Sequence, residues 1–289
     1  MNCAENRQPE ILVRGLKRAF GKVEAVRGID LELQAGELFA FLGPNGAGKT
    51  TTINMLTGLQ RPDAGSISYQ GEPFVKSSYA VRRRIGVVPQ HNNLDRELTA
   101  AENLRIHGHL FGMRGNHLNR RIDDCLELAG LSDKRDTPAG KLSGGMKRKL
   151  VIARALLHEP AILFLDEPTA GLDPHIRRKI WAFLRRINQE QRCTLFLTTH
   201  YIEEAEQLAE RVCFLDRGQI IASGSPQELM EQTGSYVLDI YRAEEVENEF
   251  FTERSAALAR LEQIKSAVRI RQTTLEDVFL QLTGKRIEP

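Results

Sequence analysis

The sequence has no long hydrophobic run. None of its apolar segments approaches the ~20 residues that a helix needs to cross a bilayer. The N-terminal stretch MNCAENRQPEILVRG also lacks the apolar segment of a secretory signal peptide. We therefore expect neither a signal peptide nor a membrane span, and any role at a membrane would have to go through a partner protein.

Cysteine and charge of one sign are also scarce. The four cysteines lie at positions 3, 125, 193 and 213 without a CxxC pair, which argues against a zinc site or a disulfide framework and fits a reducing cytosol. Lys and Arg number 40 against 38 Asp and Glu, so a net charge of +2 gives no reason to expect nucleic acid as a partner. What is present, 41% hydrophobic and 27% charged residues over 289 positions, is typical of a globular protein with a sizeable core.

Short apolar runs alternate with helical patterns along the chain. LFAFL (38–42), AILFLD (161–166) and TLFLT (194–198) are typical of strands buried on both faces of a parallel sheet. Helical patterns such as 172–188 lie between them, which predicts an α/β fold. The alternating segments ILVRGLKRAF and GIDLELQAG predict an N-terminal antiparallel β part, and 212–224 predicts a hairpin around Arg217-Gly218.

The pattern changes twice along the chain. From about 92 to 157 it is almost wholly helical, which indicates a helical subdomain inserted into a domain of about 11–225. Ser225 at the N-cap and Glu228 at N3 then form a capping box, and 226–289 is expected to be a small α/β extension. Its last helix is predicted to stop at Gly284 and to place four apolar side chains on one face: Leu275, Val278, Phe279 and Leu282.

The segment GPNGAGKT, residues 43–50, matches the phosphate-loop pattern GxxxxGK[ST], with an apolar strand before it and a helical pattern after it. Its glycines let backbone N–H groups wrap around a polyphosphate, and the helix N-terminus favours an anion. Lys49 would contact the β- and γ-phosphates, and the Thr50 hydroxyl would bind Mg²⁺. A glycine-rich turn that merely precedes a lysine is the alternative, and the flanking elements disfavour it. The predicted phosphate-binding residues are Gly43, Pro44, Asn45, Gly46, Ala47, Gly48, Lys49, Thr50 and Thr51.

A second motif, AILFLDEP, ends a predicted buried strand in two carboxylates. Asp166 is the natural second partner for a Mg²⁺ held by Thr50, and Glu167 is placed to orient or deprotonate an attacking water. Alone, the pair would more often be a solvated strand end. Together the two motifs predict a P-loop nucleoside triphosphatase, a class that also includes P-loop kinases.

Four further segments identify the kind of triphosphatase. KLSGGMKRK, together with VVPQ (87–90), AGLDP (170–174) and TTH (198–200), resembles the ATP-binding cassette (ABC) family. These segments resemble the signature, Q-loop, D-loop and H-loop and stand in the family's order over residues of about 11–225. The resemblance implies a RecA-like parallel-sheet core with ATP and Mg²⁺ as cofactors.

The resemblance also implies roles for single residues. Gln90 is similar to the Q-loop glutamine that meets Mg²⁺ and the attacking water, and His200 to the histidine that contacts the γ-phosphate. His200 taken alone would more often be structural. Phe20 matches the aromatic residue that stacks on adenine, with an ordinary core phenylalanine as the competing interpretation.

The signature implies a dimer. We identify no arginine finger in the chain, and in this family Ser143, Gly144 and Gly145 of one subunit cap the γ-phosphate held by the other. The resemblance therefore implies a head-to-tail dimer around two ATP, with Asp173 of the D-loop linking the two sites. We interpret the three cations that follow the signature as a solvated helix face rather than as ligands: Lys147, Arg148 and Lys149.

Two stretches narrow the branch of the family. VVPQHNNLDRELTAAENLRIHG and TTLEDVFLQLTG resemble the ATPases of ABC-2-type exporters, the group with nodulation-factor and daunorubicin-type drug exporters. This implies a separate integral membrane permease that docks near Gln90, and a location at the cytoplasmic face of the membrane through that permease alone. A soluble ribosome-associated or regulatory ATPase and an importer subunit remain the alternatives.

Overall fold

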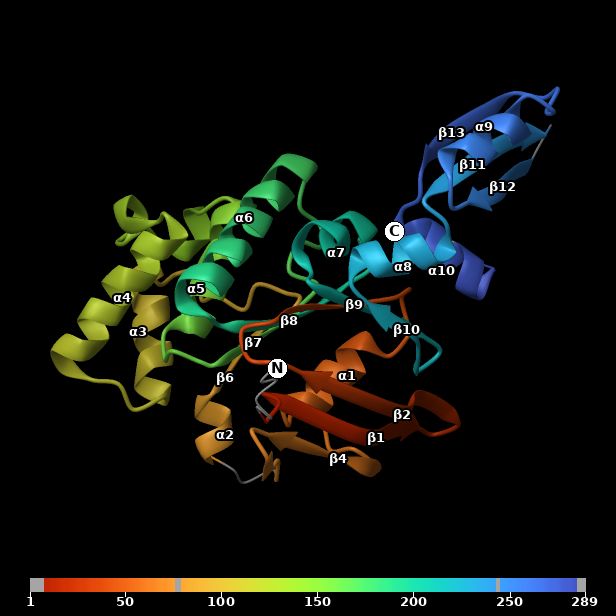
Figure 1. The fold of residues 1–289 in the computed structure, drawn as a ribbon. Coiled ribbons are helices and arrows are strands. Elements are labelled where there is room, and N and C mark those ends of the chain that lie inside the picture. Colours follow the sequence, from red (N-terminus) through yellow and green to blue (C-terminus); the bar gives the residue numbers. More distant parts are fainter. Residues whose placement is uncertain (1–7, 76–78, 243–244, 285–289) are drawn as a thin grey trace, which may run out of the picture.

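The computed structural model describes residues 8–75, 79–242 and 245–284 (Figure 1). Its centre is a six-stranded sheet in the order β10-β9-β3-β8-β7-β6. The strands are β3 (Leu38–Leu42), β6 (Ile85–Val88), β7 (Ile162–Asp166), β8 (Thr194–Thr199), β9 (Arg211–Asp216) and β10 (Gln219–Gly224). All neighbours pair in parallel except β10, which returns antiparallel to β9. The α/β class and the parallel core expected from the short apolar runs are confirmed.

Every residue of β3, β7 and β8 is buried, as predicted. Alternate side chains point to opposite faces, so the strands divide the core into two layers. Leu38 and Leu165 lie in the layer beneath the helices, whereas Phe39 and Phe164 lie in the layer shared with the N-terminal sheet. The predicted hairpin is also present, and Arg217 at its tip has the positive φ of 45° expected in a tight two-residue turn.

The N-terminal sheet has the order β2-β1-β4-β5 and is antiparallel, as expected. Its strands are β1 (Ile11–Phe20), β2 (Val23–Leu33), β4 (Ala64–Tyr69) and β5 (Glu72–Pro73). Two helices accompany it, α1 (Lys49–Leu56) and α2 (Tyr79–Arg83). Figure 1 shows this sheet on the side of the central sheet away from α5 and α6.

Between β6 and β7 the regular elements are all helices, as the sequence predicted, although residues 89–99 form no helix. It forms α3 (Ala100–Leu110), α4 (Gly115–Ala129) and α5 (Gly144–Leu156), with two short 3-10 turns, η1 (Ser132–Lys134) and η2 (Ala139–Lys141). The following helices are α6 (Pro174–Gln191) and α7 (Ile202–Leu208). Residues of α3, α4 and α5 share one continuous hydrophobic cluster with β3, β7 and β8, so the helical segment packs directly on the central sheet.

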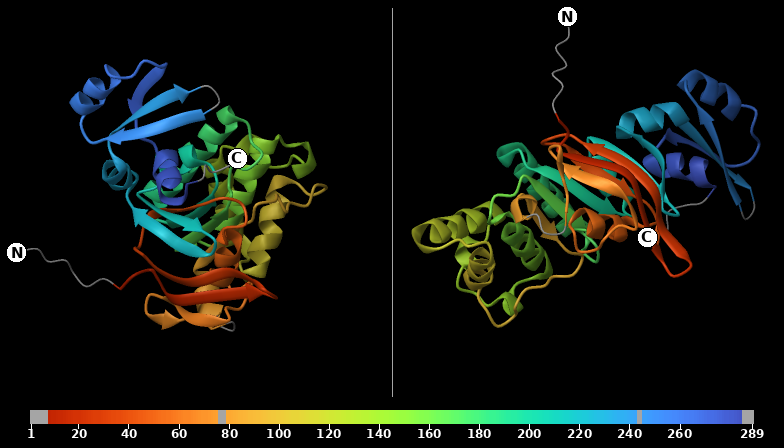
Figure 2. Two further views of the ribbon diagram at one scale, coloured as in Figure 1. Left: turned by 90° about the vertical axis from the view of Figure 1, so that its right-hand side faces the viewer. Right: turned by 90° about the horizontal axis from the view of Figure 1, so that it is seen from below.

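The C-terminal part divides into two portions that pack differently. β11 (Tyr236–Arg242), β12 (Glu245–Phe251) and β13 (Val268–Gln272) form a small sheet with α9 (Arg254–Leu261) and a core of their own. In contrast, α8 (Pro226–Thr233) and α10 (Leu275–Thr283) bury side chains in the main cluster, and the rings of Phe214 and Phe279 lie 5.6 Å apart. Figure 2 shows the small sheet and the α3–α4 region at opposite ends of the molecule.

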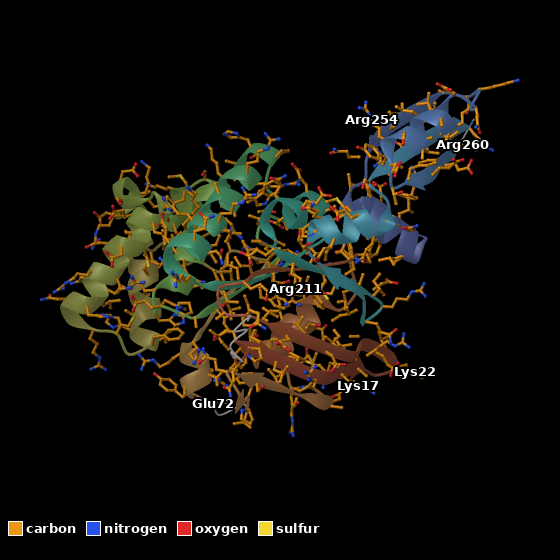
Figure 3. All side chains as sticks on the ribbon, viewed as in Figure 1. Lys17, Lys22, Glu72, Arg211, Arg254 and Arg260 are labelled. Atoms are coloured by element: carbon orange, nitrogen blue, oxygen red, sulfur yellow. The ribbon has the colours of Figure 1, made fainter. Side chains whose placement is uncertain are left out.

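The prediction for α10 is confirmed except at one residue. Leu275, Val278 and Phe279 are buried and Gly284 ends the helix in the left-handed conformation, but Leu282 is 49% exposed. Leu282 belongs to the last turn, beyond the part of the helix that rests on the main core. Within the described residues, each helix is too short or too polar to traverse a bilayer. Figure 3 shows charged side chains on separate elements, such as Lys17 on β1, Glu72 on β5 and Arg254 on α9.

Candidate nucleotide-binding site

The phosphate loop joins β3 to α1 and is enclosed by two other strands. A Cβ atom on Gly43 would lie 2.2 Å from the Leu215 carbonyl oxygen, and one on Gly48 would lie 2.3 Å from that of Ala25. Gly48 also has a φ of 106°, a conformation that other residues avoid. No side chain caps the start of α1, so its first N–H groups are available to an anion.

Lys49 folds back over this loop. Its Nζ atom donates hydrogen bonds to the carbonyl oxygens of Gly43 at 2.6 Å and Pro44 at 3.0 Å, and it lies 3.7 Å from Oε1 of Glu167. The side chain is only 5% exposed. Burial lowers the pKa of Lys49, whereas the carboxylates of Glu167 and Asp166 act in the opposite direction. The ammonium group is thus held at the mouth of the loop beside two acids.

Asp166 ends β7 and meets two hydroxyl groups. Its Oδ1 atom accepts a hydrogen bond from Thr50 at 3.1 Å and one from Thr198 at 2.6 Å. Parallel pairing sets Asp166 opposite Thr198, so the carboxyl ends of β7 and β8 meet beside α1. The described residues contain no group of three or more His, Cys, Asp and Glu suited to a metal ion. A hydroxyl next to one carboxylate instead suits Mg²⁺, which in proteins takes few side-chain ligands and completes its shell with phosphates and water.

Glu167 contacts three of the other predicted site residues. Its Oε2 atom accepts a hydrogen bond from Nε2 of Gln90 at 3.0 Å, and its Oε1 atom lies 3.1 Å from Nδ1 of His200. Contact with His200 is the strongest influence lowering the pKa of Glu167, burial opposes it, and Lys49 adds to the lowering. The carboxyl group is therefore ionised at neutral pH. The fold thus brings together four predicted site residues from four distant segments: Lys49, Gln90, Glu167 and His200.

Phe20 lies at the end of β1, in the hairpin whose second strand passes beneath Gly48. Its ring is 47% exposed, and the Arg18 guanidinium lies 5.0 Å from the ring centroid. A core phenylalanine would be covered, so this exposure removes the competing interpretation that Phe20 is an ordinary core residue. Phe20 is therefore accessible from solvent, with Arg18 beside its ring.

The signature lies apart from these residues. Ser143 is the N-cap of α5, and its hydroxyl accepts a hydrogen bond from the Met146 N–H at 3.3 Å. Ser143 and Gly144 are exposed, and within the described part of the chain no hydrogen bond joins them or Gly145 to the phosphate loop. Asp173 is likewise exposed and caps α6 by accepting from the Ile176 N–H at 3.0 Å.

One expectation about the signature helix is wrong. Arg148 is 3% exposed rather than solvated, and its guanidinium donates only to backbone carbonyl oxygens. Its neighbours are less buried: Lys147 donates to the Gly140 carbonyl, and Nζ of Lys149 lies 5.7 Å from the Phe183 ring centroid. The sequence held one weak signal for this, because the apolar residues Val151, Ile152 and Ala155 lie on the same helix face as Arg148.

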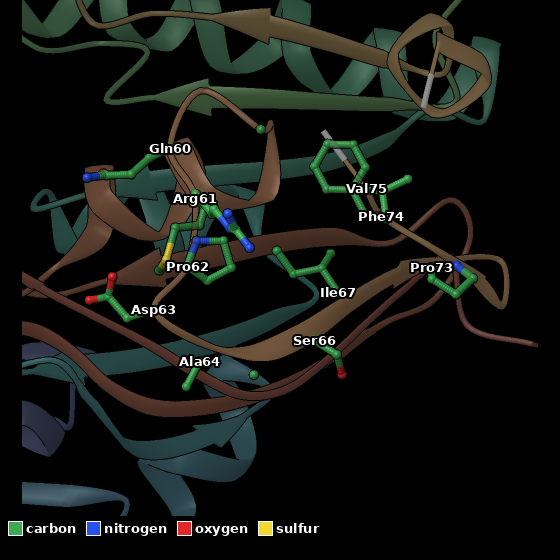
Figure 4. Close-up of a pocket in the computed structure, with 13 residues that line it drawn as sticks. Gln60, Arg61, Pro62, Asp63, Ala64, Ser66, Ile67, Pro73, Phe74 and Val75 are labelled. Carbon is green, nitrogen blue, oxygen red and sulfur yellow. The ribbon is translucent and has the colours of Figure 1, made fainter. Parts of the chain in front are cut away.

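The cavity drawn in Figure 4 is not the site around Glu167. This cavity of about 560 Å³ lies elsewhere, between the end of α1, β4 and the segment that follows β5 (Figure 4). Its charged lining residues are Arg61 and Asp63, and Asp63 is already paired with Arg18 at 2.5 Å. It contains none of the residues gathered around Glu167. The cavity and the candidate nucleotide site are therefore separate places in the molecule.

The buried strand, the glycine-rich turn and the acidic end of the neighbouring strand place this chain among the P-loop nucleoside triphosphatases. Residues 26–170 match the family model described as ABC transporter. Nod factor export ATP-binding protein I of Burkholderia lata is 41% identical over 95% of this chain and 97% of its own length. The protein of the same name from Rhizobium sp. strain N33 is 42% identical with the same coverage. This chain belongs to the ABC transporter ATP-binding family, whose members bind ATP and are ATPases.

Solved structures give the same result for the fold. The structure of cbiO1 from Clostridium perfringens, part of the ABC transporter complex cbiONQ, has a TM-score of 0.72 and 29% identity, and covers 77% of this chain and 90% of its own. A dimeric ATP-binding cassette in a post-hydrolysis state, bound to ADP and Pi, has a TM-score of 0.66 and 29% identity. That match covers 74% of this chain and 98% of the cassette.

Proposed function

We propose that this chain is the ATP-hydrolysing subunit of an ABC-2-type exporter and drives a separate membrane permease. The observation that supports export is the extent of the similarity. The Nod factor export proteins match 95% of the chain, including its C-terminal extension, whereas the cbiO1 cassette matches 77%. The division into a cassette of about 11–225 and an extension of 226–289 stays a prediction, and the packing of α8 and α10 on the main core ties the two together.

ATP would bind across the end of β1, the phosphate loop and the carboxyl end of β7. The Phe20 ring would stack on adenine, and Gly43–Thr51 would hold the phosphates with N–H groups at the start of α1. Lys49 would exchange the carbonyl oxygens of Gly43 and Pro44 for phosphate oxygens, a stronger charge-assisted contact. Thr50, Asp166 and Gln90 would hold Mg²⁺, which would neutralise phosphate charge when bound.

Glu167 would act as the general base. Its ionised carboxylate has Gln90 on one oxygen and His200 on the other, so both neighbours fix its direction. A water placed between Glu167 and the γ-phosphate would lose its proton to the carboxylate as its oxygen attacks phosphorus, while the bond from phosphorus to the bridging oxygen breaks and leaves ADP and inorganic phosphate. His200 would then hold the γ-phosphate in place.

A second copy would complete the site. The first turn of α5 has no acidic residue, and among the described residues no hydrogen bond joins Ser143, Gly144 or Gly145 to the phosphate loop of their own chain. Exposed N–H groups at a helix start attract an anion, so they suit the γ-phosphate bound by a partner subunit. We infer a head-to-tail dimer around two ATP, in which the exposed Asp173 lies between the two sites.

The permease would dock near Gln90 and the α3–α5 segment, which would hold the chain at the cytoplasmic face of the membrane. A tagged chain purified from its host in a mild detergent tests this directly. Glu167→Gln with ATP should be captured in the membrane fraction together with one integral membrane protein. Lys49→Met, which we expect to bind ATP more weakly, is the matched control for nucleotide-dependent capture. Exclusive association with ribosomes, or recovery without any membrane protein, would contradict the proposal.

A further inference from the structure

We propose that Arg148 is a positioning residue that fixes Gln90 and Glu167 relative to each other and connects both to the signature helix. The inference rests on the proposed ATPase mechanism and extends it to a residue that does not touch nucleotide. Arg148 lies on α5, one turn after Ser143 and Gly144. Its guanidinium reaches from this helix to the two loops that carry Gln90 and Glu167.

Every donor of this guanidinium is used. An arginine side chain has five N–H groups in a fixed planar arrangement. In this chain Nε donates at 2.6 Å, Nη1 at 2.7 and 3.2 Å, and Nη2 twice at 3.3 Å. The five acceptors are all backbone carbonyl oxygens, those of Pro168, Pro89, Gln90, Asp166 and Glu167. No other side chain in the described residues joins these two loops through so many hydrogen bonds.

The position is unusual for a charged group. Arg148 is 3% exposed and, among the described residues, has no carboxylate within ion-pair distance. Burial lowers its pKa to about 10, with the carboxylates of Glu204 and Asp166 acting in the opposite direction. A buried charge without an ion pair is costly unless its hydrogen bonds are satisfied. Here carbonyl dipoles satisfy it, which makes the loops and the arginine mutually dependent.

The five hydrogen bonds of Arg148, which we call the Arg148 clamp, hold a strained piece of backbone. Glu167 has a φ of 45°, a left-handed conformation that residues other than glycine rarely adopt. Three consecutive carbonyl oxygens around it, from Asp166 to Pro168, accept from Arg148, while its N–H donates to the Thr198 carbonyl at 3.1 Å. This backbone conformation is what aims the Glu167 carboxylate at Gln90 and His200.

The same turn has a natural reporter. The Thr169 hydroxyl and the Nε1–H of Trp181 both donate to Oε1 of Glu204, at 2.8 and 2.9 Å. Trp181 is the single tryptophan of the chain and is 6% exposed. Because Thr169 directly follows Pro168, release of the Pro168 carbonyl should change the surroundings of the indole. The fluorescence emission of Trp181 therefore reports on the Arg148 clamp in the protein that has no nucleotide bound.

The consequence concerns coupling between the two half-sites. A helix moves as a rigid unit, so a shift of the α5 start toward a partner's nucleotide also moves Arg148. Arg148 then carries the Gln90 and Glu167 loops with it. Engagement of the signature on one nucleotide would thereby align the base that acts on the other.

The test compares Arg148→Gln and Arg148→Lys with Arg121→Gln. Arg121 is the matched control because it donates to the Leu156 and Leu157 carbonyl oxygens at the far end of α5. We expect Arg148→Gln to lower kcat on the order of 10²-fold, as a small misplacement of a catalytic group does. Its affinity for Mg-ATP should be unchanged, and Trp181 emission of the nucleotide-free protein should shift. Arg148→Lys, with three donors in place of five, should give intermediate values.

Several outcomes would overturn the proposal. One is an Arg148→Gln protein that hydrolyses ATP at the wild-type rate. A second is an Arg148→Gln protein that loses affinity for Mg-ATP and kcat to the same extent, in proportion to a fall in its Tm. A third is an Arg121→Gln protein whose Trp181 emission shifts as much as that of Arg148→Gln. If Arg148→Gln does not fold, Arg148→Lys decides through its kcat and emission. A wild-type chain without ATPase activity would instead refute the proposed function, whereas normal activity that only Glu167→Gln abolishes would refute the Arg148 inference alone.

Discussion

The helices α1 and α5 both begin at a glycine-rich turn, but their surroundings differ. At α1 the loop is enclosed by β2 and β9, and Lys49, Asp166 and Glu167 supply charge of both signs. At α5 the start is exposed, Ser143 caps its own helix, and the first turn carries no acid. In the proposed mechanism the backbone donors at α1 would hold phosphate within their own chain, whereas those at α5 would act only on the nucleotide of a partner subunit.

The largest effect is expected from Glu167→Gln, which removes the base from the α1 site. We expect hydrolysis to fall by about 10²–10⁴-fold, the usual contribution of a general base, while ATP binding is kept. Stable dimers should accumulate with ATP, because the α5 start then stays on its partner's nucleotide. Phosphate release and size-exclusion chromatography measure the two effects, with exposed Glu203→Gln as the control. An unimpaired hydrolysis rate would remove Glu167 from its role.

The second largest effect should come from Lys49→Met, which removes the cation from the phosphate loop. Loss of a charge-assisted contact of about 1.5–3 kcal/mol should weaken ATP binding by roughly 10- to 150-fold. Titration with a fluorescent ATP analogue measures it, and exposed Lys22→Met should bind normally. Unchanged affinity would show that the α1 site does not depend on its lysine.

A substitution at the start of α5 tests whether the two helix starts belong to the same nucleotide site. Ser143→Asp keeps a good N-cap for α5 but faces the partner's γ-phosphate with a negative charge. ATP affinity of the monomer should stay normal, whereas ATP-induced dimerisation and hydrolysis should fall by about tenfold or more. Ser143→Asn keeps the cap without the charge and should lose much less. If affinity collapsed as in Lys49→Met, the signature would belong to its own chain's site and the trans arrangement would be wrong.

Local signals carried the predictable part of the fold and site. The buried strands, the hairpin at Arg217-Gly218 and the phosphate loop each depend on residues that are neighbours in sequence, and composition and spacing suffice for them. The convergence of Gln90, Glu167 and His200 was predicted only through resemblance to a family. Its geometry arises where the ends of β6, β7 and β8 meet, and no spacing along the chain encodes that meeting.

Arg148 shows where sequence reasoning failed. It sits in a run of three cations, and such a run is usually solvated. Its burial depends on five carbonyl oxygens from residues 89–90 and 166–168, which come together only in the folded chain. The prediction for Leu282 was wrong in the opposite sense, since an apolar side chain predicted to be buried is exposed. An apolar position on a helix is buried only as far as the core beneath it extends.

The smallest effect concerns pH and the base at the α1 site. Contact with His200 leads the influences that lower the pKa of Glu167 from its ordinary value of 4.5. A base with a lowered pKa stays ionised, so hydrolysis should persist as pH falls toward 4.5 and be lost only below it. In His200→Gln the pKa should rise, and the acid limb of the residual activity should move to higher pH. Exposed His117→Gln is the control, and pH–rate profiles decide: an acid limb unmoved in His200→Gln would mean that His200 does not set the charge of the base.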